Sequence, residues 1–382
     1  MALIRKSKNY SKRHAALITP KRQLRPLSAA AFSLLFAGIG VTALAAAYAS
    51  TGNFSVSLNP QLGSLAGSAK VVSSGAAIGS QAVQFNPSWS STTPAPSLAP
   101  SGPSPYVPIP ARVAGAYWTN WDPLTLANTS KSYNMLWVFA ATSTGTSGAV
   151  SFGAPISEPM AQLKTDIQAR RAAGTCVMLT VGGEGASFYL TNQAQATAFV
   201  NSIYSIYAQL GGFDGIDWDI ENTSMINSTQ LVWIGQQLKA HYGQSFHITW
   251  AAADPSWIAN GPSAVAAMVQ GGSLDAVDVM GYDFGQSSES AKISAVESYV
   301  NSWVSTTGSA SRVIIGIQLP NADDGATNTF GSYTSDITLW DWAHSTYPTI
   351  RGMDIWTAYE DARSNGGSGG TFVSQVIPAV LK

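Results

Sequence analysis

Three carboxylic acids stand at every second position of one short segment. Asp217, Asp219 and Glu221 close the run Phe213–Glu221, whose intervening residues are apolar toward its end. Because successive side chains of a β-strand point to opposite faces, this spacing puts all three carboxyl groups on one face. Carboxyl groups held close together raise one another's pKa, so we expect at least one of them to hold a proton near neutral pH. A general acid needs such a proton, and the run therefore predicts a catalytic strand end.

A D-x-D-x-E run is also found in calcium loops and on the polar faces of edge strands. A calcium loop of the EF-hand type needs polar spacers, but the spacers here are Trp218 and Ile220. It also needs a glycine at its sixth position, and no glycine follows Glu221 before Gly235. An edge strand would carry lysine or alternate its charges. The catalytic interpretation fits better, and we expect neither a metal ion nor a cofactor.

Four motifs in a fixed order give the chain a family resemblance. Asp214–Glu221 reads D-x-x-D-x-D-x-E and resembles the signature of the family 18 glycoside hydrolases, the chitinases and their relatives. Thr180–Gly183 resembles the family's S-x-G-G motif, with threonine in place of serine, which keeps a hydroxyl group. Met280–Asp283 resembles its M-x-Y-D motif, and Trp356 resembles its tryptophan of the last strand. The resemblance extends from about Val113 to the C-terminus.

The resemblance implies a retaining, substrate-assisted mechanism, in which the substrate itself supplies the nucleophile. The N-acetyl group of the sugar would attack the anomeric carbon and form an oxazolinium ion, while Glu221 protonates the departing oxygen and later activates water. Asp219 would accept a hydrogen bond from the acetamide N–H, and Asp217 would share a proton with Asp219. Tyr282 would hold the acetamide oxygen.

Further residues near the strand ends are expected to bind the sugar or to support the site. The expected binding residues are Asp283, Met280, Trp356, Tyr117, Trp118 and Trp121, with Trp356 as the floor under the sugar. The expected structural residues are Asp214, Gly182 and Gly183. Alternatives stay open: Met280 and Tyr282 as ordinary barrel lining, Asp283 as a helix cap and Trp356 as core. Glu184 is a further acid near the site to which the sequence assigns no role.

Charge divides the chain into two unlike parts. No Asp or Glu precedes Asp122, and nine of the 20 Lys and Arg residues lie before Ala111. The remaining 11 basic residues face all 21 acids, so the part from Ala111 onward has a formal net charge of −10. An acidic domain with interspersed tryptophans argues against nucleic acid as a partner and favours a neutral ligand.

The first 110 residues are predicted to export and tether the rest. Leu27–Ala49 is uncharged and rich in alanine, follows a basic stretch and ends in A-Y-A. These features predict residues 1–49 as an export signal, or as an uncleaved membrane anchor, since about 20 apolar residues span a bilayer. Residues 50–110, rich in Ser, Gly, Pro and Ala, are predicted to be a disordered linker. A secreted or cell-envelope protein would result, without an intrachain disulfide because Cys176 is the single cysteine.

From residue 111 to residue 382, apolar β-rich runs alternate with stretches of helical periodicity. The predicted strands are Val113–Thr119, Met135–Ala141, Cys176–Gly182, Phe213–Glu221, Phe246–Ala253, Ala276–Asp283, Arg312–Leu319 and Gly352–Ala358. Predicted helices include Pro159–Ala173, Ala194–Leu210, Leu231–Tyr242 and Ile293–Thr306. Eight strands joined by such crossovers predict an α/β fold, a (β/α)8 TIM barrel, whose chemistry lies at the C-terminal strand ends. A chain that begins at Ala111 should then fold on its own.

Taken with the resemblance, the sequence predicts a monomeric, endo-acting chitinase that hydrolyses β-1,4 bonds between N-acetylglucosamine units of chitin. Only about 30 residues separate Pro320 from Gly352, room for one helix near Thr334–Ser345. The α+β insertion that walls the groove of many chain-end chitinases is therefore expected to be absent. An endo-β-N-acetylglucosaminidase acting on glycoprotein glycans and a non-catalytic lectin of the same fold are the two alternatives.

Overall fold

The computed structural model describes residues 105–382 apart from residues 257, 259, 284, 319–328 and 365–369, together with Phe32–Ser33 and Leu44–Ala45. The chain divides into two units, Met1–Pro94 and Ala95–Lys382. In the first unit, the two-residue strands β1 (Phe32–Ser33) and β2 (Leu44–Ala45) pair antiparallel. The rest of the predicted signal and most of the predicted linker lie outside the described residues. Among the described residues, no helix combines the length and the apolar character that crossing a bilayer requires.

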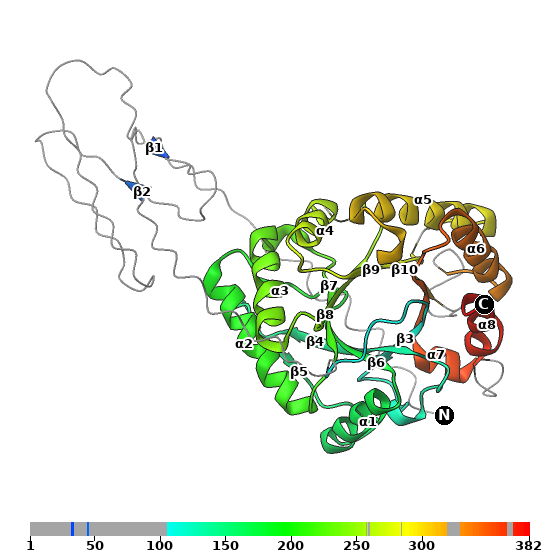
Figure 1. The fold of residues 1–382 in the computed structure, drawn as a ribbon, viewed down its shortest axis with the longest axis horizontal. Coiled ribbons are helices and arrows are strands. Elements are labelled where there is room, and N and C mark those ends of the chain that lie inside the picture. Colours follow the sequence, from blue (N-terminus) through cyan, green and yellow to red (C-terminus); the bar gives the residue numbers. More distant parts are fainter. Residues whose placement is uncertain are drawn as a thin grey trace, which may run out of the picture. The chain divides into compact units, whose positions relative to one another are not determined.

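Eight parallel strands close into a barrel (Figure 1). They are β3 (Val113–Thr119), β4 (Met135–Ser143), β6 (Cys176–Gly182), β7 (Gly215–Asp219), β8 (His247–Ala252), β9 (Ala276–Met280), β10 (Val313–Gln318) and β11 (Gly352–Trp356). Each pairs with the next in this order, and β11 pairs with β3 to close the ring. A short strand, β5 (Val150–Phe152), pairs antiparallel with the end of β4. The predicted TIM barrel is confirmed.

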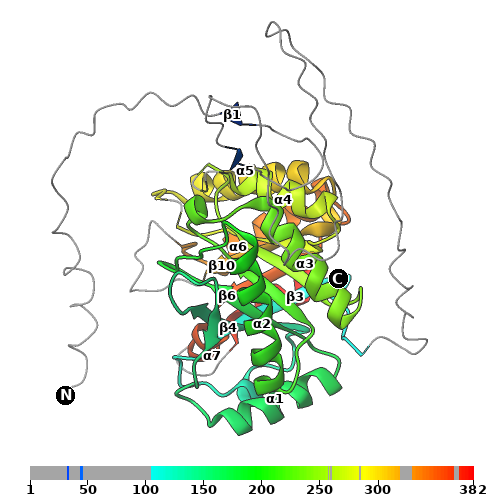
Figure 2. The same ribbon diagram turned by 90° about the vertical axis from the view of Figure 1, so that its left-hand side faces the viewer.

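Helices surround the barrel, as the view from the side also shows (Figure 2). They are α1 (Met160–Ala172), α2 (Gln193–Leu210), α3 (Ser228–Tyr242), α4 (Gly261–Gln270), α5 (Glu289–Thr307), α6 (Tyr333–Thr346), α7 (Ala358–Arg363) and α8 (Ile377–Val380). Short 3₁₀ turns lie at Leu126–Asn128, Thr223–Met225 and Ala310–Arg312, and a π-helical turn precedes α8 at Phe372–Val376. Of the described residues between β10 and β11, those in regular structure belong to α6 alone, the helix predicted there.

Helix α2 shows how the local sequence specifies these crossovers. Its apolar residues Ala196, Phe199, Val200, Ile203, Ile206 and Leu210 recur at helical spacing and are buried. Asn192 begins the helix by accepting a hydrogen bond from the backbone N–H of Gln195. Gly211 ends it in the left-handed conformation, at φ +74°, which glycine adopts without a steric penalty.

The side chains of strand β7 alternate between the outer and inner faces of the barrel sheet. Ile216 and Trp218 point outward into the layer between barrel and helices, where Trp218 stacks on Phe199 of α2 at a ring separation of 4.7 Å. Burial of a large apolar side chain stabilises the fold by about 1.5–3 kcal/mol, so this outer layer anchors the strand. Asp217 and Asp219 are consequently turned into the barrel.

The barrel unit begins earlier than the sequence indicated, because part of the predicted linker packs against it. Tyr106 is only 7% exposed, and its ring meets that of Phe246 edge-on at 5.6 Å. The backbone N–H of Val107 donates to Asp214 Oδ1 at 2.8 Å. Residues 105–110 therefore lie in the same unit as the barrel, and we propose that the catalytic domain begins before the predicted boundary at residue 110.

Candidate active site

The acid row runs along β7 from the barrel interior to its open end. Asp217 is fully buried, Asp219 is 6% exposed, and Glu221, two residues beyond the strand, is exposed. In a TIM barrel this carboxyl end of the strands is where active sites are built. The three carboxyl groups therefore lie in series between a closed interior and an accessible mouth.

Asp217 is held by three hydroxyl groups from three other strands. Thr249 Oγ1 donates to its Oδ1 at 2.6 Å, while Thr180 Oγ1 and the Tyr117 hydroxyl approach its Oδ2 at 3.0 and 3.2 Å. Burial raises the pKa of Asp217 to about 7, and these hydroxyl groups oppose the shift. Thr180 stands where the resembling motif has serine, and its hydroxyl group makes a direct contact with the acid row.

Asp219 lies in the middle of the row, and one of its carboxyl oxygens accepts no hydrogen bond from the described residues. Its buried Oδ1 has no hydrogen-bond partner among the described residues. Burial raises the pKa of Asp219 well above its ordinary value, and the charges of Glu221 and Asp217 raise it further. A buried acceptor without a partner costs about 1–3 kcal/mol, and such exceptions in native proteins call for a specific explanation. A ligand that donates an N–H to this oxygen would satisfy it.

Glu221 combines access to solvent with a raised pKa. Burial of the carboxyl group raises its pKa to about 7, and the charges of Glu184 and Asp283 contribute in the same direction. The group therefore holds a proton over an appreciable fraction of the time at neutral pH, and it lies where a ligand can receive that proton.

The end of β9 brings the predicted M-x-Y-D residues to the same mouth. Met280 and Tyr282 are partly buried, and Asp283 is exposed with φ at +57°. Burial raises the pKa of Tyr282 well above its ordinary value, with Asp278 and Asp219 among the charges that add to it, so its hydroxyl group stays a donor. Asp283 does not cap the next helix.

That cap is Ser288, which accepts a hydrogen bond from the backbone N–H of Ala291 at the start of α5. The alternative of Asp283 as a helix cap is thereby removed for α5. The exposed carboxyl group of Asp283 lies at the mouth, where its charge raises the pKa of Glu221.

Aromatic rings form a wall beside the acids. The ring of Trp356 lies 4.8 Å from Phe139, 5.4 Å from Tyr117 and 6.3 Å from Trp121. Trp121 is 50% exposed, although its ring also packs edge-on against Phe139 at 5.3 Å. Large rings with one exposed surface supply apolar contact area at a wet site. Phe139, in the middle of β4, is a wall residue that the sequence did not single out.

Trp118 corrects one of the predicted binding residues. It is 1% exposed, lies in the layer between barrel and helices, and donates its indole N–H to the carbonyl oxygen of Leu124 at 2.7 Å. Neighbouring residues of a strand point to opposite faces, so only Tyr117 of this pair can face the barrel interior. The expectation that Trp118 lines the cleft is wrong.

Gly182 and Gly183 permit a close backbone approach at the row. Gly182 has φ at +127°, and a Cβ atom there would lie 1.9 Å from the backbone oxygen of Asp219. The N–H of Gly183 donates to that same oxygen at 3.1 Å. Any side chain at Gly182 would therefore displace the strand that carries the acids.

Asp214 supports the barrel at the opposite end of β7. Its carboxylate accepts hydrogen bonds from the backbone N–H groups of Val107 and Val177, each at 2.8 Å, and pairs with Arg171 at 2.9 Å. Every one of these contacts joins chain segments, and none involves the acid row. The geometry is that of a structural residue.

Sequence reasoning missed two further interior acids, Asp278 on β9 and Asp354 on β11. Both are buried, and the Tyr117 hydroxyl donates toward Asp278 Oδ2 at 3.0 Å. A signal was present, because each is the one acid inside an otherwise apolar strand, A-V-D-V-M and G-M-D-I-W. Acids are almost never fully buried unless they are partnered, so such a position predicts an interior polar network.

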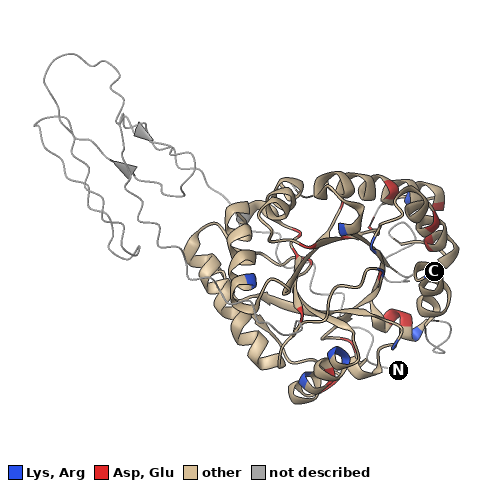
Figure 3. Ribbon diagram, in the orientation of Figure 1, with Lys and Arg blue, Asp and Glu red and all other residues tan. Residues whose placement is uncertain are grey.

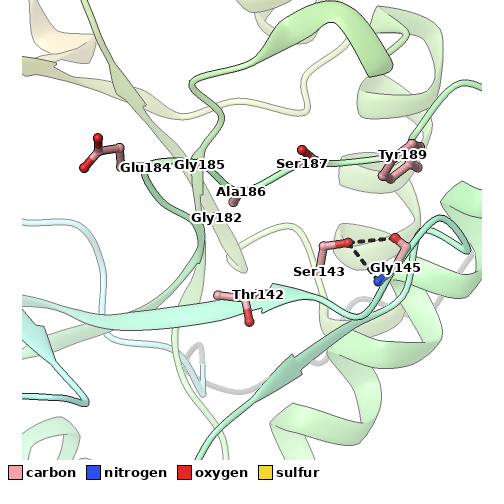
Figure 4. Close-up of a pocket in the computed structure, with 9 residues that line it drawn as sticks. All are labelled: Thr142, Ser143, Gly145, Gly182, Glu184, Gly185, Ala186, Ser187 and Tyr189. Atoms are coloured by element: carbon pink, nitrogen blue, oxygen red, sulfur yellow. Dashed lines mark hydrogen bonds between the residues drawn. The ribbon is translucent and has the colours of Figure 1, made fainter. Parts of the chain in front are cut away.

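A cavity of about 390 Å³ adjoins the row between the end of β4 and the loop after β6. Figure 4 shows Glu184 at one end of this loop, Tyr189 at the other, and Thr142 and Ser143 across from it. Gly182 borders both the cavity and Asp219. The volume lies within the usual range for small-molecule sites. Among the described residues, no group of three or more His, Cys, Asp or Glu side chains is arranged to hold a metal ion.

Charged residues elsewhere on the barrel unit are few and scattered (Figure 3).

Comparison with known proteins gives both a family and relatives. The family model described as glycosyl hydrolases family 18 matches residues 113–367. The chain is 29% identical over 164 residues to a chitinase from Paenibacillus xylanexedens, a match that covers 38% of this chain and 31% of that protein. It therefore spans less than a third of that relative's length.

Two other similarities cover more of the relative. An acidic endochitinase from Cicer arietinum is 28% identical over 224 residues, which is 55% of this chain and 71% of that protein. The crystal structure of a putative chitinase A from Streptomyces coelicolor superposes with a TM-score of 0.61 at 23% identity, covering 71% of this chain and 99% of that one. At that identity the structural likeness supports the shared fold.

Proposed function

The chain belongs to the glycosyl hydrolases of family 18, so it is a glycoside hydrolase, and we propose that it is an endo-acting chitinase. It would hydrolyse β-1,4 bonds between N-acetylglucosamine units with retention of configuration. The acetamide group of the substrate would act as the nucleophile, as in the substrate-assisted exception to the two-carboxylate rule.

The observation that carries this proposal is the unpartnered Oδ1 of Asp219. It is a buried acceptor next to the accessible acid Glu221, and the described protein offers it no donor. The acetamide N–H of an N-acetylated sugar would supply that donor. A sugar without the N-acetyl group would leave the oxygen unsatisfied, so the same atom favours N-acetylglucosamine over glucose.

The reaction then follows from the order of the acids. The acetamide oxygen forms a bond to the anomeric carbon while the glycosidic bond breaks, and Glu221 gives its proton to the departing oxygen. Asp219, with Asp217 behind it, stabilises the positive charge that develops on the acetamide. Glu221, now ionised, takes a proton from water as that water attacks the anomeric carbon and opens the oxazolinium ring. Each attack inverts the configuration of the anomeric carbon, so the two attacks together retain it.

The remaining groups at the mouth would hold the sugar. Tyr282, kept protonated by its surroundings, would donate to the acetamide oxygen and align it with the anomeric carbon. Trp356 would lie under the sugar ring, with Phe139 and Trp121 beside it. Asp283 and Met280 would complete the contacts at the end of β9.

Internal cleavage is supported by the short connection between β10 and β11, whose regular structure among the described residues is α6. The described residues of this connection form no inserted wall, so a polymer would enter the site along its length. A non-catalytic lectin would not need the accessible Glu221 with a pKa of about 7.

The test compares two substrates with the unaltered chain. Release of chromophore from a chitotriose conjugate is expected, with little trimming of a high-mannose glycoprotein. Trimming of the glycoprotein in place of the conjugate would make the protein an endo-β-N-acetylglucosaminidase. Binding of chito-oligosaccharides without turnover of either would make it a lectin and overturn the proposal.

A further inference from the structure

A second pair of acids lies inside the barrel beneath the acid row. Asp278 on β9 and Asp354 on β11 are both buried. They face each other across Gly316 of β10, where a Cβ atom would lie 3.0 Å from Asp278 Oδ1 and 3.4 Å from Asp354 Oδ1. Neither acid forms an ion pair with a cation among the described residues. Two buried carboxyl groups this close, without a cation, cannot both be ionised at low cost, so they share protons.

One hydroxyl group joins this pair to the acid row. The Tyr117 oxygen lies 3.0 Å from Asp278 Oδ2 and 3.2 Å from Asp217 Oδ2. A phenol carries a single proton, so Tyr117 can donate to only one of the two carboxylates at a time. The two acids therefore compete for one donor.

We propose that Asp278 is a positioning residue for the reaction: through the shared hydroxyl group of Tyr117 and its own charge, it sets how readily Asp217 becomes ionised. Asp278 does not reach the substrate. It would act only in the reaction proposed above, so its assignment rests on the proposed function.

The groups around Asp217 and Asp278 determine whether the charge of Asp278 raises or lowers the pKa of Asp217. The titratable neighbours are all acids or phenols: Tyr117 from β3, Asp219 from β7, Asp354 from β11 and Tyr282 beyond β9. The residues that contact the two acids from β6, β8 and β10 do not titrate and are Thr180, Thr249 and Gly316. From β4, the indole N–H of Trp137 donates to Thr249. A negative charge on Asp278 therefore opposes ionisation of Asp217, and no cation among the described residues forms an ion pair with either acid.

The pKa shifts of the buried pair act in the same direction as these contacts. Burial raises the pKa of Asp278 to about 6, and it raises the pKa of Asp354 well above its ordinary value. The charge of Asp278 raises the pKa of Asp354, as it raises that of Asp217. The Tyr117 proton is then contested by two carboxylates, and the charge of Asp278 keeps the pKa of Asp217 high.

The variant Asp278→Asn removes the charge and keeps the shape. Its amide can donate to the Tyr117 oxygen, which frees the hydroxyl proton for Asp217, so Asp217 should ionise at lower pH. The row must hold negative charge opposite the oxazolinium ion, and activity is lost as pH falls through the pKa of the row. We expect the acid limb of the kcat/KM profile on a chitotriose conjugate to move to lower pH, by on the order of 0.5 to 1 unit.

Asp354→Asn is the matched control. Its amide imitates the protonated form of Asp354, because it can donate to Asp278 while the charge of Asp278 remains. The acid limb should stay in place. The proposal would be overturned if the acid limb moved equally in both variants, or if it did not move in a folded Asp278→Asn protein. Asp278 would then be a structural residue.

A second variant covers the case in which Asp278→Asn does not fold. Tyr117→Phe deletes the shared donor, so Asp217 loses a hydrogen bond to its ionised form and the acid limb should move to higher pH. A fall in kcat with the limb unmoved would contradict the assignment.

Titration of protein labelled with ¹³C at the aspartate carboxyl groups follows Asp217 without any substrate. A lower pKa of Asp217 in Asp278→Asn supports the linkage even if the unaltered chain cleaves no chito-oligosaccharide, which would refute only the proposed function. An unchanged pKa of Asp217 refutes the linkage even if chitinase activity is present.

Discussion

At the scale of single residues, the proposed function assigns proton transfer to Glu221, the outermost acid of the row that begins on β7. Glu221 is the accessible acid of the three, and its pKa is raised to about 7. Glu221→Gln keeps the size of the side chain and removes the transferable proton. Turnover of a chitotriose conjugate should fall by at least about 10²- to 10⁴-fold, because one group serves both steps. Binding of chito-oligosaccharides, measured by calorimetry, should persist.

Glu184→Gln is the comparison for that variant, since it makes the same chemical change at the neighbouring exposed acid. It should retain most of its turnover at pH 6. Comparable turnover in Glu221→Gln and in the unaltered chain would remove Glu221 from the role of general acid.

The pH dependence provides a second residue-scale prediction. Glu221 must hold its proton to act as the acid, so kcat/KM should fall as pH rises through about 7. The charge of Glu184 is one of the causes that raise this pKa. Glu184→Gln should therefore lower the pKa of Glu221 and move the alkaline limb of the profile to lower pH. A limb that is unmoved in this variant, measured at constant ionic strength, would show that the two carboxylates do not interact.

The residue scale also shows what a sequence can and cannot reveal about a site. The period of two placed Asp217 and Asp219 on the interior face, because alternation is a local property of a strand. Trp118 lies in the outer layer because it alternates with Tyr117, and aromatic character alone does not indicate which face of a strand a residue takes. The Tyr117 hydroxyl group on β3 contacts both Asp278 on β9 and Asp217 on β7. Contacts of that kind depend on barrel closure and register, which no short sequence window contains.

At the scale of elements, the acids depend on close contact between β6 and β7. A Cβ atom at Gly182 would lie 1.9 Å from the backbone oxygen of Asp219, and φ there is +127°. Gly182→Ala should therefore displace the end of β7 and misplace the acid row. We expect a loss of stability on the order of 1–3 kcal/mol from the strained backbone and a larger fractional loss of activity. Thermal unfolding and kcat/KM would measure the two effects.

Gly185→Ala is the control for Gly182→Ala. Gly185 also has a positive φ, +72°, but no atom lies within 4 Å of its ideal Cβ position. It should lose stability through backbone strain alone and keep most of its activity. Equal losses of activity in the two variants would mean that strain, and not the approach to Asp219, determines the effect.

The elements themselves were largely predictable. Strands β3 and β6 have the predicted bounds, and the other six barrel strands differ from prediction by a few residues at their ends. The sequence did not indicate α4, whose first turn contains glycine and proline, nor the hairpin strand β5. Helix α4 is short, and β5 has only three residues, so each offers too little periodicity to stand out from a loop.

At the scale of the molecule, the chain joins a barrel unit to residues whose role is proposed from sequence alone. Export by residues 1–49 remains a prediction, because those residues lie outside the described part apart from β1 and β2. The difference in charge between the two parts of the chain agrees with such a division. An enzyme acting on an insoluble polymer would need to leave the cell, and we propose that this chain does so.

The start of the barrel unit provides the last prediction. A chain covering Ala111–Lys382 should be less stable than one covering Ala95–Lys382, because it lacks the buried ring of Tyr106 and the bond from Val107 to Asp214. Loss of one buried aromatic side chain costs about 3–5 kcal/mol, which corresponds to a thermal midpoint lower by about 10 °C. Tyr106→Ala in the longer chain removes the ring and keeps the backbone bond, so its midpoint should fall between the other two. Activity on a soluble trimer, measured below all three midpoints, should change little, since these contacts lie at the opposite end of β7 from Glu221. Equal midpoints for the two lengths would return the boundary to residue 110 and leave residues 105–110 as linker.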